Sequence, residues 1–306
     1  MQQNRGIPFQ IVVGYSLIVV GLLHVGAWLN SGQAWEGDVS WRKPILFGVS
    51  GGMTLISTGH LLRLLEPWRI DKFLSVAIAL CMATEVAIIT LQQWRGVESH
   101  FNRSSPLDAF LDSSMTLLIA IVTVCILTFA FRSLCDGFQG TSDEKIAWNG
   151  GMLFLVFSCA IGFAIYAYGV GRVEAGEDPR IYGSNGPAKF PHGVAIHAIQ
   201  LLPLLRMVLQ RFGTKQTTRL WLLYSTNAAI FLVLAYSIIQ TLAGRGRFDA
   251  DQYSTAILIL AGCMFLPVAL AVSNGLMRSL FRFINTRIQS TLLTCALRYD
   301  SKASDQ

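Results

Sequence analysis

Charged residues are scarce in this sequence. They make up 14% of the 306 residues, against about 25% in a typical soluble domain. Hydrophobic residues make up 53%, and the mean hydropathy is +0.49. This composition excludes an ordinary soluble domain and indicates an integral membrane protein.

Motifs of several common enzyme classes are also absent. The sequence has no Walker-type phosphate loop and no H-E-x-x-H, which removes the common nucleotide-binding and zincin classes. It has no C-x-x-C either, so we do not expect sulfur ligation of a metal. Only Arg5 precedes the first apolar run, and no small-residue cleavage site follows it. We therefore expect that run to be a retained helix and not a signal peptide.

Long apolar runs dominate the rest of the chain. A spanning helix needs about 20 mostly apolar residues, and such windows recur throughout the sequence. We place the spans at residues 9–30, 45–63, 73–94, 108–131, 149–170, 192–210, 219–241 and 253–276. The predicted fold is an all-α polytopic transmembrane helix bundle of about eight spans. Residues 1–276 form its single domain, and residues 277–306 form a cytoplasmic amphipathic, basic tail.

Lysine and arginine fall unevenly on the two sides of the predicted bundle. With the N-terminus in the cytoplasm, most of the 24 lysines and arginines lie in cytoplasmic connections and the tail. This excess predicts that both termini are cytoplasmic. The net charge of +6 is spread over loops and tail, so no nucleic acid partner is expected. The expected partners are membrane lipids and a small-molecule or lipid-like ligand, with a homo-oligomer or membrane-complex partner left open.

A tandem repeat, in which spans one to four correspond to spans five to eight, is an open alternative. The strings at residues 88–96 and 238–246 share an identical I-I and R-G spacing at the ends of the third and seventh spans. The strings FGVS and HGVA open the second and sixth spans. Parallel repeats of this kind build bundles with a central site.

The connection at residues 91–112, LQQWRGVESHFNRSSPLDAFLD, is unusually polar for its position between two apolar runs. Glu85 precedes it at mid-membrane, where an acidic group costs about 2.5–3.5 kcal/mol on insertion scales and needs protonation, a partner or a water-filled cavity. Asp108 and Asp112 share one helical face, although Asp108 could instead cap its helix. Glu85, His100, Asp108 and Asp112 are the candidate catalytic residues of a polar pocket opening on the outer face.

The histidines are the candidate metal ligands. The chain has five, and four of them (His24, His100, His192 and His197) fall in the outer half of the predicted bundle. Imidazole is costly to bury in lipid without a partner, so its presence there indicates function. His100, His192 and His197, together with the aspartates, make a ligand set that zinc or non-haem iron accepts.

Haem b is a second cofactor that the sequence leaves open. His24 and His197 come from different spans and could ligate a haem iron from its two sides. Arg95 and Arg245 lie near the outer surface, where they could pair with the haem propionates. These four residues are the candidate cofactor-binding residues.

Three functional classes follow from these residues. We favour a metal- or haem-dependent membrane enzyme, such as an oxidoreductase, acting on a lipid-soluble or anionic small molecule, because it uses the most polar residues. The alternative is a proton-coupled transporter in which Glu85 and the outer His and Asp groups relay protons while arginines receive an anion. The third class is an accessory subunit of a membrane complex.

Three short patterns carry a resemblance. They are W-R-K-P at residues 41–44, Q-x-x-R-G-x-x-S-H-F-N at residues 92–102 with Asp108 following, and H-x4-H-A-x-Q-x2-P at residues 192–203. In these patterns the chain resembles a group of bacterial multi-spanning integral membrane proteins. The resemblance implies a location in the bacterial cytoplasmic (inner) membrane and transfers no activity.

Overall fold

The fold is built almost entirely from helices. The computed structural model describes residues 7–135 and 137–303, and from residue 284 onward the backbone alone. The elements are α1 (Phe9–Ser31), α2 (Arg42–Leu64), α3 (Asp71–Trp94), α4 (Pro106–Cys135), α5 (Ser142–Glu174), β1 (Ile181–Tyr182), β2 (Gly186–Pro187), α6 (Phe190–Ile196), α7 (Ala198–Arg211), α8 (Gln216–Leu242) and α9 (Gln252–Ala303). The described residues contain eight stretches long and apolar enough to cross a membrane, with α6 and α7 forming one of them. The predicted all-α polytopic bundle is confirmed.

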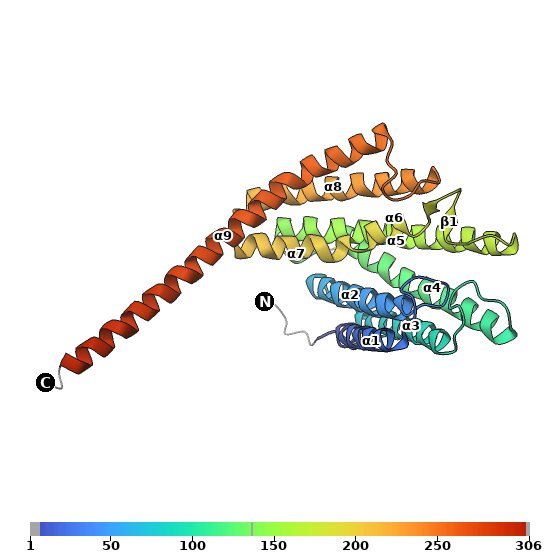
Figure 1. The fold of residues 1–306 in the computed structure, drawn as a ribbon, viewed down its shortest axis with the longest axis horizontal. Helices are drawn as coiled ribbons and strands as arrows, with labels where there is room; N and C mark the ends of the chain where they lie inside the picture. The colour runs from blue at the N-terminus through green and yellow to red at the C-terminus, as the bar shows by residue number, and fades with distance from the viewer. Residues whose placement is uncertain (1–6, 136, 304–306) are drawn as a thin grey trace.

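Each predicted span lies inside one of these helical stretches. The largest difference is at the C-terminal end, where α9 continues without a break to Ala303. Figure 1 shows this helix passing along α8 and then projecting beyond the rest of the bundle. The backbone of the predicted tail is thus a continuation of the last helix through residue 303, and the side chains beyond residue 283 lie outside the described residues.

The helices fall into two halves, α1–α4 and α5–α9, which form separate layers in Figure 1. In the first half α1 packs on α2 and α3, α2 packs on α3, and α3 packs on α4. In the second half α5 packs on α6, α7 and α8, the α6–α7 pair packs on α8, and α8 packs on α9. The packing order is therefore the same in both halves once α6 and α7 are taken as one span, as a tandem four-helix repeat requires.

The ends of α3 and α8 place the two halves in register. Gly96 and Gly244 have φ angles of 70° and 65°, a conformation that glycine adopts without steric cost. In each case the glycine N–H donates to a carbonyl in the last turn of the helix. The N–H of the following residue donates to the carbonyl of Gln92 in α3 and of Gln240 in α8. The structure therefore pairs Gly96 with Gly244, two residues before the Gly246 that the matching strings had predicted.

Glycines let α1 and α2 approach very closely. A Cβ atom added to Gly14 would lie 2.7 Å from the carbonyl oxygen of Gly52, and one added to Gly48 would lie 3.0 Å from the Cα of Gly21. Lipid gives no hydrophobic drive for helices to associate, so close backbone contact between small residues is a main source of packing energy in a membrane. This contact makes α1 and α2 the most tightly packed helix pair of the first half.

The two halves meet along a seam formed by α2 and α4 on one side and α5 and α7 on the other. A single apolar cluster joins them, and it includes Leu55 of α2, Met152 and Leu155 of α5, and Ile199 of α7. We use two names for the ends of the bundle. The N-terminal face carries the start of α1 and the connections at residues 65–70, 136–141 and 212–215, and the distal face carries the other connections.

Polar pairs brace the N-terminal face. The Arg132 side chain is 1% exposed, and its guanidinium lies 2.5 Å from a carboxylate oxygen of Asp71. The same guanidinium stacks over the indole ring of Trp68. Asp143 on α5 accepts from two arginines, Arg206 of α7 at 3.1 Å and Arg219 of α8 at 2.7 Å. These ion pairs join residues that are far apart along the chain.

The glycine contact generates a stability prediction. Gly14→Ala should lower the free energy of unfolding by about 1–3 kcal/mol, because the added methyl group forces α1 away from α2. Gly26→Ala, in the same helix, meets no atom within 4 Å and serves as the matched control. Thermal unfolding of the purified protein in detergent measures both. Equal melting temperatures for the two variants would contradict the proposed packing role of Gly14.

Candidate functional site

The α3–α4 connection, residues 95–105, lies on the distal face, which is the predicted outer face. Asp108, at the start of α4, receives hydrogen bonds from Gln92 Nε2 at 3.1 Å, Arg95 Nη1 at 2.6 Å and Ser105 Oγ at 2.6 Å. Its own backbone N–H donates to Ser105 Oγ at 3.1 Å. Both carboxylate oxygens are occupied by side-chain donors, so Asp108 holds the end of α3 to the start of α4. The hydroxyl that caps the helix is that of Ser105, which accepts the Asp108 N–H.

Asp112 is also fully used. Its side chain is 1% exposed and accepts from the Phe101 backbone N–H at 2.9 Å and from the Tyr166 hydroxyl at 3.0 Å, with Arg103 at 3.7 Å. Phe101 has a φ of 62°, the one positive value at a non-glycine position in the described chain. Its ring stacks on Tyr166 with centroids 5.5 Å apart. Asp112 therefore stabilises an uncommon backbone conformation and fastens the connection to α5 of the other half.

His100 is held in the same connection, near two lysines. Its Nδ1 lies 2.9 Å from Ser99 Oγ, and its ring packs on Phe47 with centroids 5.5 Å apart. Burial, together with the charges of Lys189 and Lys43, lowers the pKa of His100 to about 3. The imidazole is therefore neutral at pH 7, and its cationic form is strongly disfavoured.

Lys43 and Lys189 mark the distal end of the seam, at the starts of α2 and α6. The Lys43 ammonium donates to the Asp38 carbonyl oxygen at 2.7 Å. Within the described chain Lys189 has neither a hydrogen-bond acceptor nor an ion-pair partner for its side chain. Burial and the nearby charges of Lys43, Arg42 and Arg180 lower the pKa of Lys189 to about 8. Arg42 and Arg180 are themselves paired with carboxylates, those of Glu36, Asp38 and Asp178. Lys189 is therefore the cation without a partner in the described chain where the two halves meet on this face.

The structure does not bring the predicted metal ligands together. His100 packs on α2, whereas His192 Nδ1 donates to the Ser158 carbonyl of α5 at 2.9 Å and His197 is exposed at the junction of α6 and α7. No three His, Cys, Asp or Glu side chains in the described residues are close enough to hold a metal ion. The ligand set of His100, His192 and His197 with Asp108 or Asp112 is therefore not assembled here.

The predicted haem-binding residues are likewise distributed over separate environments. His24 donates from Nδ1 to the Val20 carbonyl at 2.7 Å and packs on Trp41 in the first half, while His197 belongs to the second half. Arg95 is paired with Asp108, and Arg245 is paired with Asp251 at 2.6 Å. The arginines predicted to pair with propionates are thus already neutralised by carboxylates within the chain.

Arg245 belongs to a second network that corresponds to the first. Gln240, at the end of α8, is fully buried like Gln92 at the end of α3. Asp251 precedes α9 and accepts from Arg245 and from the Ser254 backbone N–H at 2.7 Å, while Ser254 Oγ reaches Gln240 Oε1 at 3.5 Å. A glutamine, an arginine, a serine and an aspartate thus close the distal end of each half. We interpret both networks as structural.

Glu85 is an exception among the carboxylates. It lies in α3, seven residues before Gln92 on nearly the same face, and is 4% exposed. Its Oε2 atom is the one buried carboxylate oxygen in the described chain without a hydrogen-bond partner. An unpaired ionised carboxylate would be strongly destabilised in this setting. The prediction that Glu85 is protonated, paired or solvated therefore still applies.

A cleft of about 530 Å³ lies elsewhere, on the N-terminal side of the seam. Its lining residues come from α2 of the first half and from α5 and α7 of the second. They are Ile56, Ser57, His60, Arg63, Leu64, Glu144, Ala147, Trp148, Ile199, Gln200, Pro203, Leu204, Arg206 and Met207. The sequence analysis missed this cleft. Its signal was Ser57 and His60 at i, i+3 on one apolar helix, which places both on one face.

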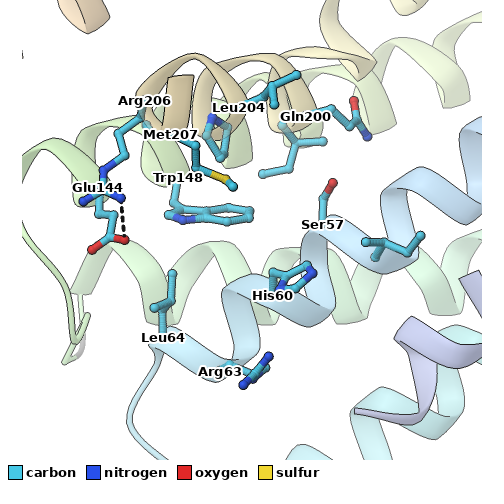
Figure 2. A pocket seen from close by; sticks show the side chains of 14 residues that line it. Ser57, His60, Arg63, Leu64, Glu144, Trp148, Gln200, Leu204, Arg206 and Met207 are labelled. Carbon is cyan, nitrogen blue, oxygen red and sulfur yellow. Dashed lines mark ion pairs between the residues drawn. The ribbon is translucent and has the colours of Figure 1, made fainter. Parts of the chain in front are cut away.

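The two walls of the cleft differ in chemistry. Figure 2 shows Ser57 and His60 on α2 at one side and Trp148 with Leu204 at the other. The side chains of Ser57, His60 and Arg63 have neither a hydrogen bond nor an ion pair within the part of the chain that the structure describes. The cleft therefore has a polar wall with free hydrogen-bonding groups and a largely apolar wall.

Arg206 closes one end of the cleft and is already neutralised. It contacts Asp143 and Glu144, each at 3.1 Å, and donates to Thr141 Oγ1 at 3.2 Å. Glu144 is the one acidic residue among those lining the cleft, and Figure 2 shows it facing Arg206. No free carboxylate therefore opposes the positive charge of Arg63.

Comparisons with protein-family models, with curated protein sequences and with solved structures give no match for this chain. The resemblance in the W-R-K-P and related patterns therefore stays a prediction. The function has to be argued from the geometry of the chain itself.

Asp112 generates a stability prediction. Asp112→Ala should lower the free energy of unfolding by about 3–5 kcal/mol, because it leaves the Phe101 N–H and the Tyr166 hydroxyl without their acceptor. Tyr166→Phe removes one hydrogen bond only and should cost about 1 kcal/mol. Thermal unfolding in detergent measures both. If Asp112→Ala has the same melting temperature as the unmodified protein, the Asp112 carboxylate does not anchor the α3–α4 connection.

His100 generates a pH prediction. Its folded-state pKa of about 3 lies below the unfolded value of about 6.5, so the unfolded chain binds more protons between these values. His100 therefore does not lower the free energy of unfolding above pH 6.5. Below that pH it lowers this free energy by up to about 1.4 kcal/mol for each pH unit. Melting temperatures between pH 7 and pH 5 should fall less steeply for His100→Gln than for the unmodified protein. His197→Gln, at an exposed position, is the control, and identical slopes for all three proteins would contradict the assignment.

Proposed function

We propose that this protein is a membrane carrier for a small anion, with the substrate path along the seam between its two halves. The observation that carries the proposal is the cleft on the N-terminal side of the seam, which draws its walls from both halves. Carriers built from two related halves place their substrate site at the interface between them. Relative motion of the halves can then expose the site to one side of the membrane at a time.

The seam supports this proposal because apolar packing closes the cleft toward the distal face. Leu55, Met152, Leu155 and Ile199 belong to one apolar cluster that spans both halves. Beyond that cluster, at the distal end, lie Lys43 and Lys189. A site that opens on one face and is blocked by apolar packing toward the other is what one end state of an alternating-access cycle requires.

The charge distribution favours an anion as the substrate. Arg63 lies at the cleft without a carboxylate partner, and the distal end of the same seam carries Lys43 and Lys189. Cations at both ends of a low-dielectric path attract anions and repel cations. Under the predicted topology, the cleft would open to the cytoplasm and the lysine pair would face outward.

A carrier accounts for the described residues better than the metal- or haem-dependent enzyme favoured by the sequence. The enzyme needs His100, His192 and His197, or His24 and His197, to share a site, and these side chains lie in separate environments. A carrier needs no such cluster. It also gives a role to Glu85, whose unpaired buried oxygen makes it the best proton-binding candidate for coupling.

The proposal predicts one-sided access to the cleft. After the native cysteines are replaced by alanine, a cysteine at Gln200 should react with a membrane-impermeant maleimide from the N-terminal face only. A cysteine at Ser104, in the α3–α4 connection, should react from the distal face only. Labelling of oriented membranes followed by mass spectrometry measures both. Reaction of the Gln200 position from the distal face only would contradict the placement of the cleft in this proposal.

Flux measurements complete the test. The purified protein in proteoliposomes should give currents on a solid-supported membrane with at least one of chloride, phosphate, acetate, succinate and benzoate. Arg63→Gln should reduce that current by at least about tenfold, since a charge-assisted contact is lost. Arg69→Gln makes the same charge change in the connection at residues 65–70, outside the cleft, and should leave the current unchanged. Absence of current with every anion, together with absence of radiolabelled anion uptake, which also detects electroneutral proton–anion symport, would overturn the proposal.

A further inference from the structure

We infer that the cleft at the seam binds an anion attached to a ring-bearing apolar body, with the anionic group on the α2 wall and the ring against Trp148. This inference rests on the proposed function and names the substrate class of the same site. It follows from the contrast between the two walls, the free donors on one of them and the size of the space between them.

The α2 wall provides the recognition of the anionic group. Ser57, His60 and Arg63 follow one another at intervals of three residues, so a hydroxyl, an imidazole and a guanidinium rise along neighbouring turns of the helix. Each can donate a hydrogen bond, and none is committed to another group in the described chain. A guanidinium binds carboxylate, sulfonate or phosphate oxygens through two parallel hydrogen bonds.

The opposite wall has no free carboxylate with which it could bind a cation. Its acid, Glu144, faces Arg206, and the neighbouring Asp143 is shared by Arg206 and Arg219. What that wall offers is apolar surface, since Leu204 and Met207 are 56% and 60% exposed. A bound apolar body would cover surface that is otherwise left open at the seam.

Trp148 favours a ring in that apolar body. Figure 2 shows its indole lying across the cleft between the α2 wall and the α7 wall. Aromatic rings that pair with such a surface gain about 0.5–1.5 kcal/mol beyond the area they bury. The cleft volume of about 530 Å³ falls within the range of small-molecule sites. Met207 adds a flexible side chain that can adjust to different ring shapes.

Binding of a matched pair of probes tests the inference. 2-Naphthoate and 2-naphthamide have nearly the same shape, and only the first carries a charge. Equilibrium dialysis of the full-length protein in detergent should show one bound 2-naphthoate per chain and an affinity at least about tenfold above that of the amide. Arg63→Gln should remove this preference, and Trp148→Leu should weaken the binding of both probes. Arg69→Gln should change neither.

Three results would overturn the inference. One is equal affinity of the two probes for the unmodified protein, and another is an unchanged preference in Arg63→Gln. The third is loss of the preference in Arg69→Gln, which would indicate a general surface charge effect. Melting temperatures of the variants, together with the affinity of Arg63→Gln for the amide, separate loss of the site from loss of the fold.

The anionic amphiphile could be a soluble aromatic acid or a lipid, and nanodiscs distinguish the two. If phosphatidylglycerol in phosphatidylcholine nanodiscs displaces 2-naphthoate, the occupant is an anionic lipid of the adjacent leaflet, and the requirement for a ring against Trp148 is overturned. If it does not, the occupant is a soluble acid. The result is also distinct from the test of the carrier. Binding without flux overturns the carrier alone, and flux of a small inorganic anion without naphthoate binding overturns this ligand class alone.

Discussion

Every polar group that the chain takes into the membrane needs a partner inside the protein, because the hydrocarbon supplies none. Specific pairs meet this requirement for most of the charged residues in the helices. Asp112 joins the α3–α4 connection to α5, Asp143 lies between two arginines, and the buried Arg132 guanidinium reaches Asp71. The polar residues that look catalytic along the sequence are therefore largely the ones that hold the bundle together.

The same requirement makes the exceptions informative. Glu85 has a buried carboxylate oxygen without a partner, and Ser57, His60 and Arg63 present free polar groups to the cleft. An unpaired buried polar group costs about 1–3 kcal/mol, so a structure that retains one usually has a functional use for it. Glu85 lies in the interior of the first half and the other three residues lie at the seam, and the carrier proposal assigns coupling to the former and binding to the latter.

The repeat in the packing order explains why the seam is the place for a site. Within each half a residue near the start of the first helix contacts the second and third helices. In one half Gln10 does so through its side-chain amide and its backbone N–H, and in the other Asp143 does so through its carboxylate. Gln92 and Gln240 close the opposite ends. Each half is thus internally braced at both ends. The contact between the halves has fewer such polar links, which leaves room for the cleft and for relative motion.

The sequence by itself determined the eight spans, because hydropathy depends on residues close together in the chain. It did not determine the partner of Asp112, which is Tyr166, 54 residues away, nor the burial and the nearby lysines that lower the pKa of His100. It also set the cleft-lining His60 apart from the candidate site. Hydrophobicity acts on each residue separately, whereas pairing depends on which helix faces meet, and only the packing of the whole bundle decides that.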